Sequence, residues 1–327
     1  MPRPGEPGEP VDPLDEEFRS VAATAAKGDL VAARSALRRL ADRAESAGRR
    51  ASASRAQRLS AALDRVLGDT ADAAATARRA AELAGTERDL VAAAHDELGE
   101  ALLTLGHADG AADAFGRAAD AAAAAGLGTA PALRRKQAYA LATGGHATAA
   151  ADVLTDLAGD SAEPAARAAM LVQAAAGAAG TTGAADLWTA ARAAVDATGG
   201  GAGTQALRAD LAFVAAAEAL QRGDLAGALA QVRAARRHAL DAINPLSYTA
   251  AAVAESSLAE HAGDDESAYG SLATGYATLG DLVGRQLSAQ TFEGPLLELR
   301  RRWGQDRFAA AKAAYEASRR RYLTTKP

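Results

Sequence analysis

The 327-residue chain contains no cysteine, which excludes disulfide bonds, thiolate metal sites and cysteine nucleophiles. Aromatic residues make up only 4% of the chain, although 49% of its residues are hydrophobic. Most of the hydrophobic residues are alanine, the strongest helix former, and an interior made of alanine requires backbones that approach closely. This composition predicts an all-α protein with tightly packed helices.

Long apolar runs are also missing. No stretch reaches the roughly 18 apolar residues of a membrane span, and the Pro-, Gly- and Glu-rich residues 1–10 lack the apolar core of a secretory signal. We therefore expect a cytoplasmic protein without a membrane partner. The formal net charge of -5 and the few aromatics disfavour nucleic-acid binding. Lysine is scarce beside arginine, which together with the excess of alanine and glycine is typical of a GC-rich bacterial genome.

One pattern recurs along the chain, with a glycine followed by small and large apolar residues at fixed distances. The glycines lie 35 to 43 residues apart. Because a single helix pair cannot bury its apolar face alone, a repeat of this length predicts helix pairs that stack on their neighbours. The clearest copy contains Leu98, Gly99, Leu102, Gly106, Ala111, Phe115 and Ala118, and the recurring glycines are Gly28, Gly68, Gly106, Gly145, Gly180, Gly223, Gly263 and Gly304.

The clearest copy resembles the consensus of the tetratricopeptide repeat, which has a glycine at the turn within the pair and the pattern A-x3-F-x2-A on the second helix. The resemblance implies a right-handed α-solenoid of about eight helix-turn-helix repeats with a C-terminal capping helix. A period nearer 40 than the family's 34 residues indicates longer helices, as in some bacterial regulator sensor domains and kinesin light chains. Asp29, Asp69, Asp224 and Asp264 follow turn glycines and are expected N-caps.

The composition also predicts how the chain is divided. Residues 1–13 have little to bury and are predicted to be a disordered arm. Repeats 1–5 are expected over residues 14–197, and repeats 6–8 with the capping helix over residues 205–327. The glycine-rich segment 198–204 interrupts the helical pattern and is predicted to be a flexible linker, or a hinge between two halves of the array. It lacks the Walker lysine and the preceding strand of a nucleotide-binding loop.

Histidines and carboxylates do not form a recognisable catalytic or metal-binding pattern. His107 and His146 each follow a turn glycine, where other repeats carry aspartate, so turn and capping chemistry explains them. His238 with Asp241 falls short of the ligand count of a zinc site. We therefore predict no catalytic residue, no cofactor, no metal and no enzymatic activity. A triad assembled from distant residues is left open, because its contacts are not visible in the sequence.

The first helix of each repeat lines the concave face in tetratricopeptide arrays. By this analogy the inward positions of the second repeat are rich in arginine, whereas later repeats offer small residues and isolated aromatics. The stretch 34–58 holds eight arginines against Asp42 and Glu45. It is either a solvated helix face or a dock for an acidic peptide, for which the bidentate geometry of arginine is suited. The candidate partner-binding residues on this face are Arg55, Arg58, Arg65, Arg135, Tyr139 and Phe213.

A second cluster of arginines and aromatics lies near the C-terminus. Phe308, Tyr315 and Tyr322 recur every seven residues, so they share one face of the expected capping helix over residues 306–323. Aromatic and arginine residues are enriched in interface cores, but a packed cap also contains aromatics, and both explanations remain open. Arg301, Trp303 and Tyr315 are therefore further partner-binding candidates.

The resemblance implies a protein-protein interaction scaffold or adaptor that holds a peptide or protein segment on the concave face. The arginines favour an acidic partner. The alternative is a ligand- or peptide-sensing regulatory module whose curvature changes on binding.

Overall fold

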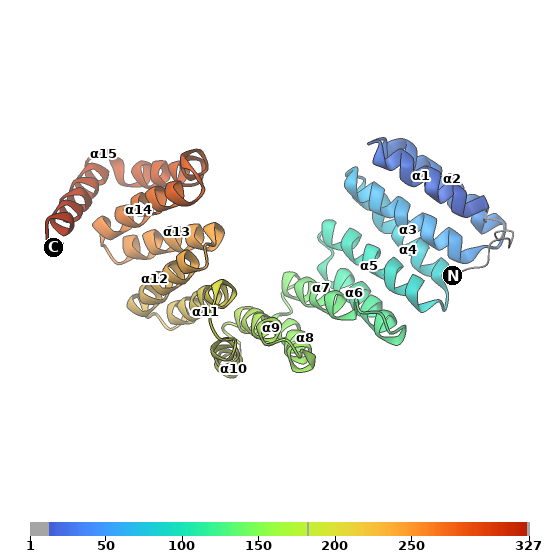
Figure 1. The fold of residues 1–327 in the computed structure, drawn as a ribbon, viewed down its shortest axis with the longest axis horizontal. Coiled ribbons are helices and arrows are strands. Elements are labelled where there is room, and N and C mark those ends of the chain that lie inside the picture. The colour runs from blue at the N-terminus through green and yellow to red at the C-terminus, as the bar shows by residue number, and fades with distance from the viewer. Residues whose placement is uncertain (1–12, 182, 326–327) are drawn as a thin grey trace, which may run out of the picture. The chain divides into compact units, whose positions relative to one another are not determined.

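The computed structural model describes residues 13–181 and 183–325, and within these ranges the chain forms α-helices joined by short turns, without a strand (Figure 1). The chain divides into two compact units, residues 1–157 and 158–327, which we call unit 1 and unit 2 and describe separately. Apart from Pro13, the predicted N-terminal arm lies outside the described residues. The fold is an all-α solenoid, as the alanine-rich repeat predicts.

In unit 1 each helix from α1 to α6 packs against the next, and α3 also contacts α5 (Figure 1). The helices form consecutive pairs, one pair for each repeat. Their bounds are α1 (Pro13–Ala26), α2 (Leu30–Ser46), α3 (Arg50–Val66), α4 (Thr70–Ala84), α5 (Arg88–Thr104), α6 (Ala108–Ala124), α7 (Ala130–Thr143) and α8 (Ala147–Asp160), which extends past Leu157.

Unit 2 continues the pairing. Its last element contains Gly304 with non-helical backbone angles (φ 77°, ψ 170°), so that α15 is two helical segments joined at the predicted eighth turn. Consecutive helices pack against each other, and α9 also contacts α11. The bounds are α9 (Pro164–Gly177), α10 (Ala184–Ala197), α11 (Ala202–Gln221), α12 (Leu225–Asp241), α13 (Pro245–His261), α14 (Asp265–Val283) and α15 (Arg285–Thr325).

The turns within the helix pairs confirm the predicted glycines. All eight have positive φ, between 75° and 88°, a conformation that glycine adopts without the steric cost of a Cβ. Three of the four aspartates that follow them cap the next helix: Asp29, Asp224 and Asp264 each accept a hydrogen bond from a backbone N–H three residues later, at 2.8 to 3.0 Å. Asp69 is the exception, because its carboxylate pairs with Arg34 instead.

One turn between repeats has a residue other than glycine at its left-handed position. Gly48 and Gly126 have φ of 71° and 68°, and the residue after each donates its N–H to the fifth carbonyl upstream. Ile243 occupies the same place between α12 and α13, with φ 52° and with Asn244 donating to the carbonyl of Ala239 at 2.9 Å. A β-branched residue rarely adopts this left-handed conformation. The Ile243 side chain is 71% exposed.

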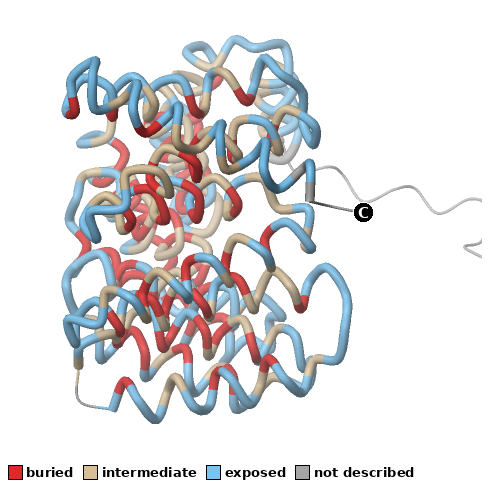
Figure 2. The backbone as a smooth tube through the Cα atoms, turned by 90° about the vertical axis from the view of Figure 1, so that its left-hand side faces the viewer, coloured by how far each residue is buried: buried red, intermediate tan, exposed pale blue. Residues whose placement is uncertain are grey.

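The core consists mainly of alanine, with single large side chains filling the gaps. Buried residues lie on the helix sides that face neighbouring helices, and the turns are exposed (Figure 2). A close approach in the core involves Gly99 of α5, where an added Cβ would lie 2.6 Å from the fully buried ring of Phe115 on α6. Gly275 makes a similar approach to Phe292 in unit 2, at 2.7 Å. Small residues at these points allow the helices to pack closely.

The predicted glycine-rich linker does not coincide with the division between the two units. Residues 198–204 comprise the turn after α10 and the start of α11, whereas the units divide between Leu157 and Ala158. A hinge at 198–204, and the domain limits that depend on it, stay predictions. In the last segment, Phe308 packs against the core cluster that contains Phe292 and Trp303, and the Tyr315 hydroxyl lies 2.9 Å from Thr274 Oγ1.

Candidate functional site

Helices α3, α5 and α7, which open the second, third and fourth repeats, are linked by side chains into one surface of unit 1. Arg65 Nε on α3 donates to Glu97 Oε1 on α5 at 3.1 Å. Lys136 Nζ on α7 lies 2.6 Å from Asp96 Oδ1 and 2.8 Å from Glu100 Oε1 on α5. We call this set the first-helix surface, and it comprises Arg55, Arg58, Arg65, Asp96, Glu97, Glu100, Arg135, Lys136 and Tyr139.

The centre of the first-helix surface is internally paired. Glu97 is buried, and burial raises its pKa against the opposing effect of the hydrogen bond from Arg65. For Lys136, burial opposes the charged form, but hydrogen bonds to Asp96 and Glu100 outweigh it and raise the pKa. Three carboxylates thus face two cations, which gives this central strip a formal charge of -1.

The two flanks of the surface differ from the centre because their arginines lack partners. Arg55 and Arg58 lie one helical turn apart on α3, and Arg135 lies on α7 beside Tyr139. None of the three arginines makes an ion pair or a side-chain hydrogen bond within the described part of the chain. Tyr139 is 64% exposed. The first-helix surface therefore presents two cationic flanks on either side of a weakly acidic centre.

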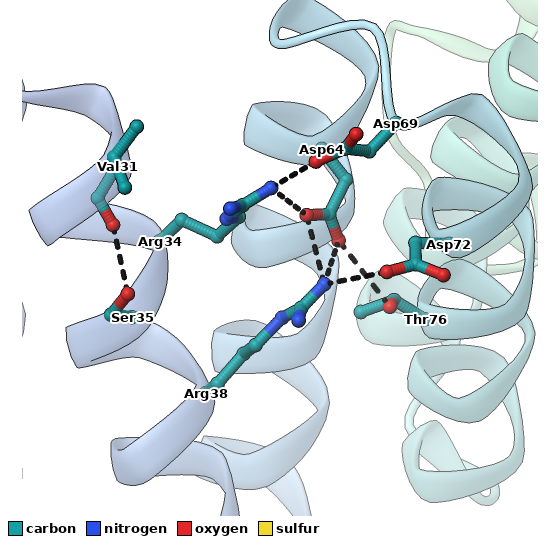
Figure 3. Close-up of polar contacts among 8 residues, drawn as sticks. All are labelled: Val31, Arg34, Ser35, Arg38, Asp64, Asp69, Asp72 and Thr76. Atoms are coloured by element: carbon teal, nitrogen blue, oxygen red, sulfur yellow. Dashed lines mark hydrogen bonds and ion pairs between the residues drawn. The ribbon is translucent and has the colours of Figure 1, made fainter.

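The arginines that precede Arg55 in the sequence serve a different purpose. Arg34 and Arg38 of α2 reach the fully buried carboxylate of Asp64 on α3, with nitrogen–oxygen distances of 3.3 and 3.0 Å (Figure 3). Thr76 of α4 donates to the same carboxylate at 3.4 Å, and the hydrogen bond to Asp64 raises the pKa of Arg38 although burial opposes this. A buried carboxylate requires such partners, so the cluster joins α2, α3 and α4.

Most of the remaining arginines in the stretch 34–58 are also held within unit 1. Arg43 pairs with Glu17, and Arg50 donates to the backbone carbonyl of Glu82 at 3.0 Å. Arg39 is exposed on α2. The stretch is thus neither one solvated face nor one dock, because it divides into inter-helix contacts, the exposed Arg39, and the pair formed by the exposed Arg55 and the half-buried Arg58.

Of the predicted residues of unit 2, Arg301 is exposed, whereas Phe213, Trp303 and Tyr315 are packed against other side chains. Phe213 packs, half-buried, against the alanine-rich cluster of α11 to α13. Trp303 is only 8% exposed and donates its indole N–H to Glu260 at 2.7 Å. Arg301 pairs with Glu298 on its own helix at 2.8 Å, and the Tyr315 ring lies edge-on to Tyr269 at 5.7 Å.

Unit 2 contains a buried carboxylate that the sequence did not reveal. Glu255 of α13 accepts hydrogen bonds from Arg233 at 2.8 Å and Arg236 at 2.9 Å. Arg236 also donates to the hydroxyl of Tyr248 at 2.8 Å, and this bond contributes to its raised pKa against the effect of burial. Beside this group lies an open polar pocket of about 220 Å³, which Tyr315 also lines. That volume is below the usual range of pockets for drug-sized ligands.

The described residues form no metal site and no membrane-spanning helix. No group of three or more histidine or acidic side chains is placed to hold a metal ion in these parts of the chain. His95 has a buried Nδ1 without a hydrogen-bond partner, and burial together with Arg117 lowers its pKa. A search of the same residues also found no helix with the length and apolar character to cross a bilayer.

No family model matches the sequence, and no curated protein matches it. Solved structures do match. The apo form of the quorum sensor NprR from B. thuringiensis aligns with a TM-score of 0.51 and 10% identity, covering 92% of this chain and 83% of that one. The chain has a tetratricopeptide-like fold.

Two further structures resemble this tetratricopeptide-like chain more distantly. The tetratricopeptide-like repeats assigned to a kinesin light chain of Podosopora anserina align with a TM-score of 0.45 and 16% identity, covering 57% of this chain and 96% of that one. Naa15 in its complex with Naa10 and HypK-THB gives 0.44 and 13%, covering 93% of this chain and 46% of that one. At these identities the comparisons describe the fold of the chain.

The repeat register assigned Arg55, Arg58, Arg135 and Tyr139 to the first helices of their repeats, and they lie on α3 and α7. Their part in partner binding stays a prediction. The pairing of Lys136 with Asp96 and Glu100 was not foreseen, although the two acids are four residues apart and so face the same way on α5. Aligning the first helices of adjacent repeats shows the opposite charges side by side, and this was the available signal.

Proposed function

We propose that the chain is an interaction scaffold that holds an acidic segment of a partner protein on the first-helix surface of unit 1. The observation that supports this most directly is the set of unpaired arginines Arg55, Arg58 and Arg135, on a surface whose carboxylates are already paired. Arginine presents planar, bidentate donors to carboxylates. Unpaired arginines beside an exposed aromatic ring are also typical of residues that dominate binding energy in interfaces.

The proposal requires that salt weaken the interaction. Exposed charge pairs are screened over about 8 Å at physiological ionic strength, so affinity should fall as salt rises, while contacts to Tyr139 persist. No catalytic residue and no cofactor is part of this proposal.

The test is a pull-down from the native host at moderate salt, with the full chain as bait. The double variant Arg55→Glu/Arg58→Glu should retain less of any partner that the unaltered chain retains, by about tenfold or more, because two attractive contacts become repulsive. Arg65 is left unchanged, since a glutamate there would face the buried Glu97. The matched control is Arg39→Glu/Arg78→Glu, which makes the same charge change on the exposed sides of the second helices α2 and α4.

Circular dichroism should show equal helix content and thermal stability in both double variants. Equal retention by the two variants would contradict the proposal and return Arg55 and Arg58 to the role of solvated surface residues.

The alternative function is a module that senses a small ligand or peptide. The same host extract used for the pull-down distinguishes it from the scaffold function. If no protein is retained by the unaltered chain while a small molecule from the host extract raises its melting temperature, the sensing function replaces the scaffold. The polar pocket near Tyr315 is the first place to look for such a ligand, although its size and openness do not favour one.

A further inference from the structure

We infer that the segment bound by the first-helix surface is bipartite: it carries two acidic groups separated by about five or six residues, and the residues between them are neutral or basic. This inference rests on the proposed function and specifies the chemistry of the partner. The partner is a protein segment in extended conformation that runs across α3, α5 and α7.

The charge of the central strip determines which residues the middle of the bound segment can carry. Within the described residues, Asp96, Glu97 and Glu100 pair with Arg65 and Lys136, so one formal negative charge is left over on α5. An acidic residue placed there would meet net repulsion, because both cations already contact carboxylates. A neutral or basic residue meets no such penalty.

The positions of the flanks determine the spacing. α3 packs against α5, and the side chain of Lys136 bridges α5 and α7. With about 8–10 Å for each step between helices, the two steps together span about 16–20 Å. An extended chain rises about 3.3 Å per residue. Acidic groups that reach Arg55 and Arg58 at one end and Arg135 at the other are therefore about five or six residues apart.

The two flanks also differ from each other. Arg55 and Arg58 are three residues apart on one helix face, so their side chains are neighbours and can take two carboxylates. The other flank offers one guanidinium, that of Arg135, next to the exposed ring of Tyr139 four residues on. It suits one acidic residue followed or preceded by an apolar one, because the ring provides a contact that a carboxylate does not use.

The inference is tested by fluorescence anisotropy with synthetic labelled peptides and the full chain. Each peptide carries Glu-Glu at one end and Glu-Leu at the other, joined by a glycine–serine spacer of two, five or nine residues, in both chain orders. A further peptide, in each chain order, has the five-residue spacer with two of its residues changed to glutamate. We expect one of the five-residue peptides to bind most tightly, by about tenfold over the two-residue peptides.

The peptide with the acidic spacer gives the sharpest comparison. General attraction between the arginines and a more negative peptide predicts tighter binding, whereas the bipartite surface predicts binding several-fold weaker than that of the neutral spacer. Arg55→Gln/Arg58→Gln and Arg135→Gln should each weaken the five-residue peptide, and Tyr139→Ala should weaken it at high salt as well. Arg78→Gln on α4 is the control and should leave it unchanged.

Binding that is independent of spacing, tighter binding of the acidic spacer, or no binding by any peptide would overturn the inference. Failure of this inference is distinguishable from failure of the proposed function. If only the inference fails, a partner is still captured by the unaltered chain and lost with Arg55→Glu/Arg58→Glu, but its bound segment does not show the bipartite acidic pattern.

Discussion

At the scale of single residues, Ile243 is the side chain least suited to its backbone. Left-handed φ costs an L-residue about 1–2 kcal/mol, and more for a branched side chain. Little burial offsets this cost, because the side chain is mostly exposed. The equivalent positions in unit 1, Gly48 and Gly126, avoid the cost altogether.

We therefore expect Ile243→Gly to stabilise the protein by about 1 kcal/mol, the relief of strain being partly offset by the greater freedom of glycine in the unfolded chain. The urea midpoint of unfolding, followed by circular dichroism, measures this. Ile243→Ala keeps the Cβ and should recover less. A destabilised Ile243→Gly variant would show that the isoleucine makes contacts worth more than the strain.

Residue type alone does not say what an arginine does in this chain. Arg38 is held by the buried carboxylate of Asp64, Arg65 by Glu97, and Arg301 by Glu298 on its own helix, whereas Arg55 is unpaired. The difference depends on which acid faces the side chain from the adjoining helix. That acid comes from another repeat, some thirty residues away in the first two cases.

At the scale of helix pairs, the contact between Gly99 and Phe115 sets how closely α5 and α6 approach. We expect Gly99→Ala to destabilise the protein by about 2 kcal/mol, because the ring is fully buried and has no room to move. Gly203→Ala makes the same chemical change where the added methyl meets open space on α11, and it should be neutral or slightly stabilising. Thermal unfolding of the two variants compares them directly; equal stability would mean that the helices separate at little cost.

The sequence predicted the helix pairs well because the signals for them are local. A turn glycine with positive φ and a capping aspartate such as Asp224 act within a few residues, and all eight turns were found in this way. The departures arise from contacts between repeats. Asp69 was expected to cap α4, but Arg34 of α2 takes its carboxylate.

The candidate site was predictable only in part, for the same reason. Repeat register placed Arg55 and Tyr139 on the correct helix face. It did not separate exposed aromatics from packed ones, so Trp303 was included although it is buried against the last helix segment. The burial of an aromatic ring depends on neighbours that lie in other elements, and a helix pattern does not contain them.

At the scale of the whole molecule, the division into two compact units predicts two independent folding units. Each unit has its own set of internal contacts, and a repeat array can fold in separate parts because each repeat contacts only its neighbours. We expect residues 13–160 and 161–325, expressed separately, each to be helical and to unfold cooperatively in urea by circular dichroism. A cut between α4 and α5, which pack against each other within unit 1, should instead give fragments of lower stability or solubility. Unfolded or aggregated halves from the first cut would show that the units depend on each other.

The two tryptophans give unit 2 an optical signal that unit 1 lacks. Trp188 and Trp303 both lie after residue 157, and the chain has no other tryptophan. Because Trp303 is buried with its indole N–H bonded to Glu260, its emission should shift to longer wavelength when unit 2 opens. Tryptophan emission, excited selectively, therefore follows only unit 2, and a melting curve recorded in this way does not report on helices α3, α5 and α7 of unit 1.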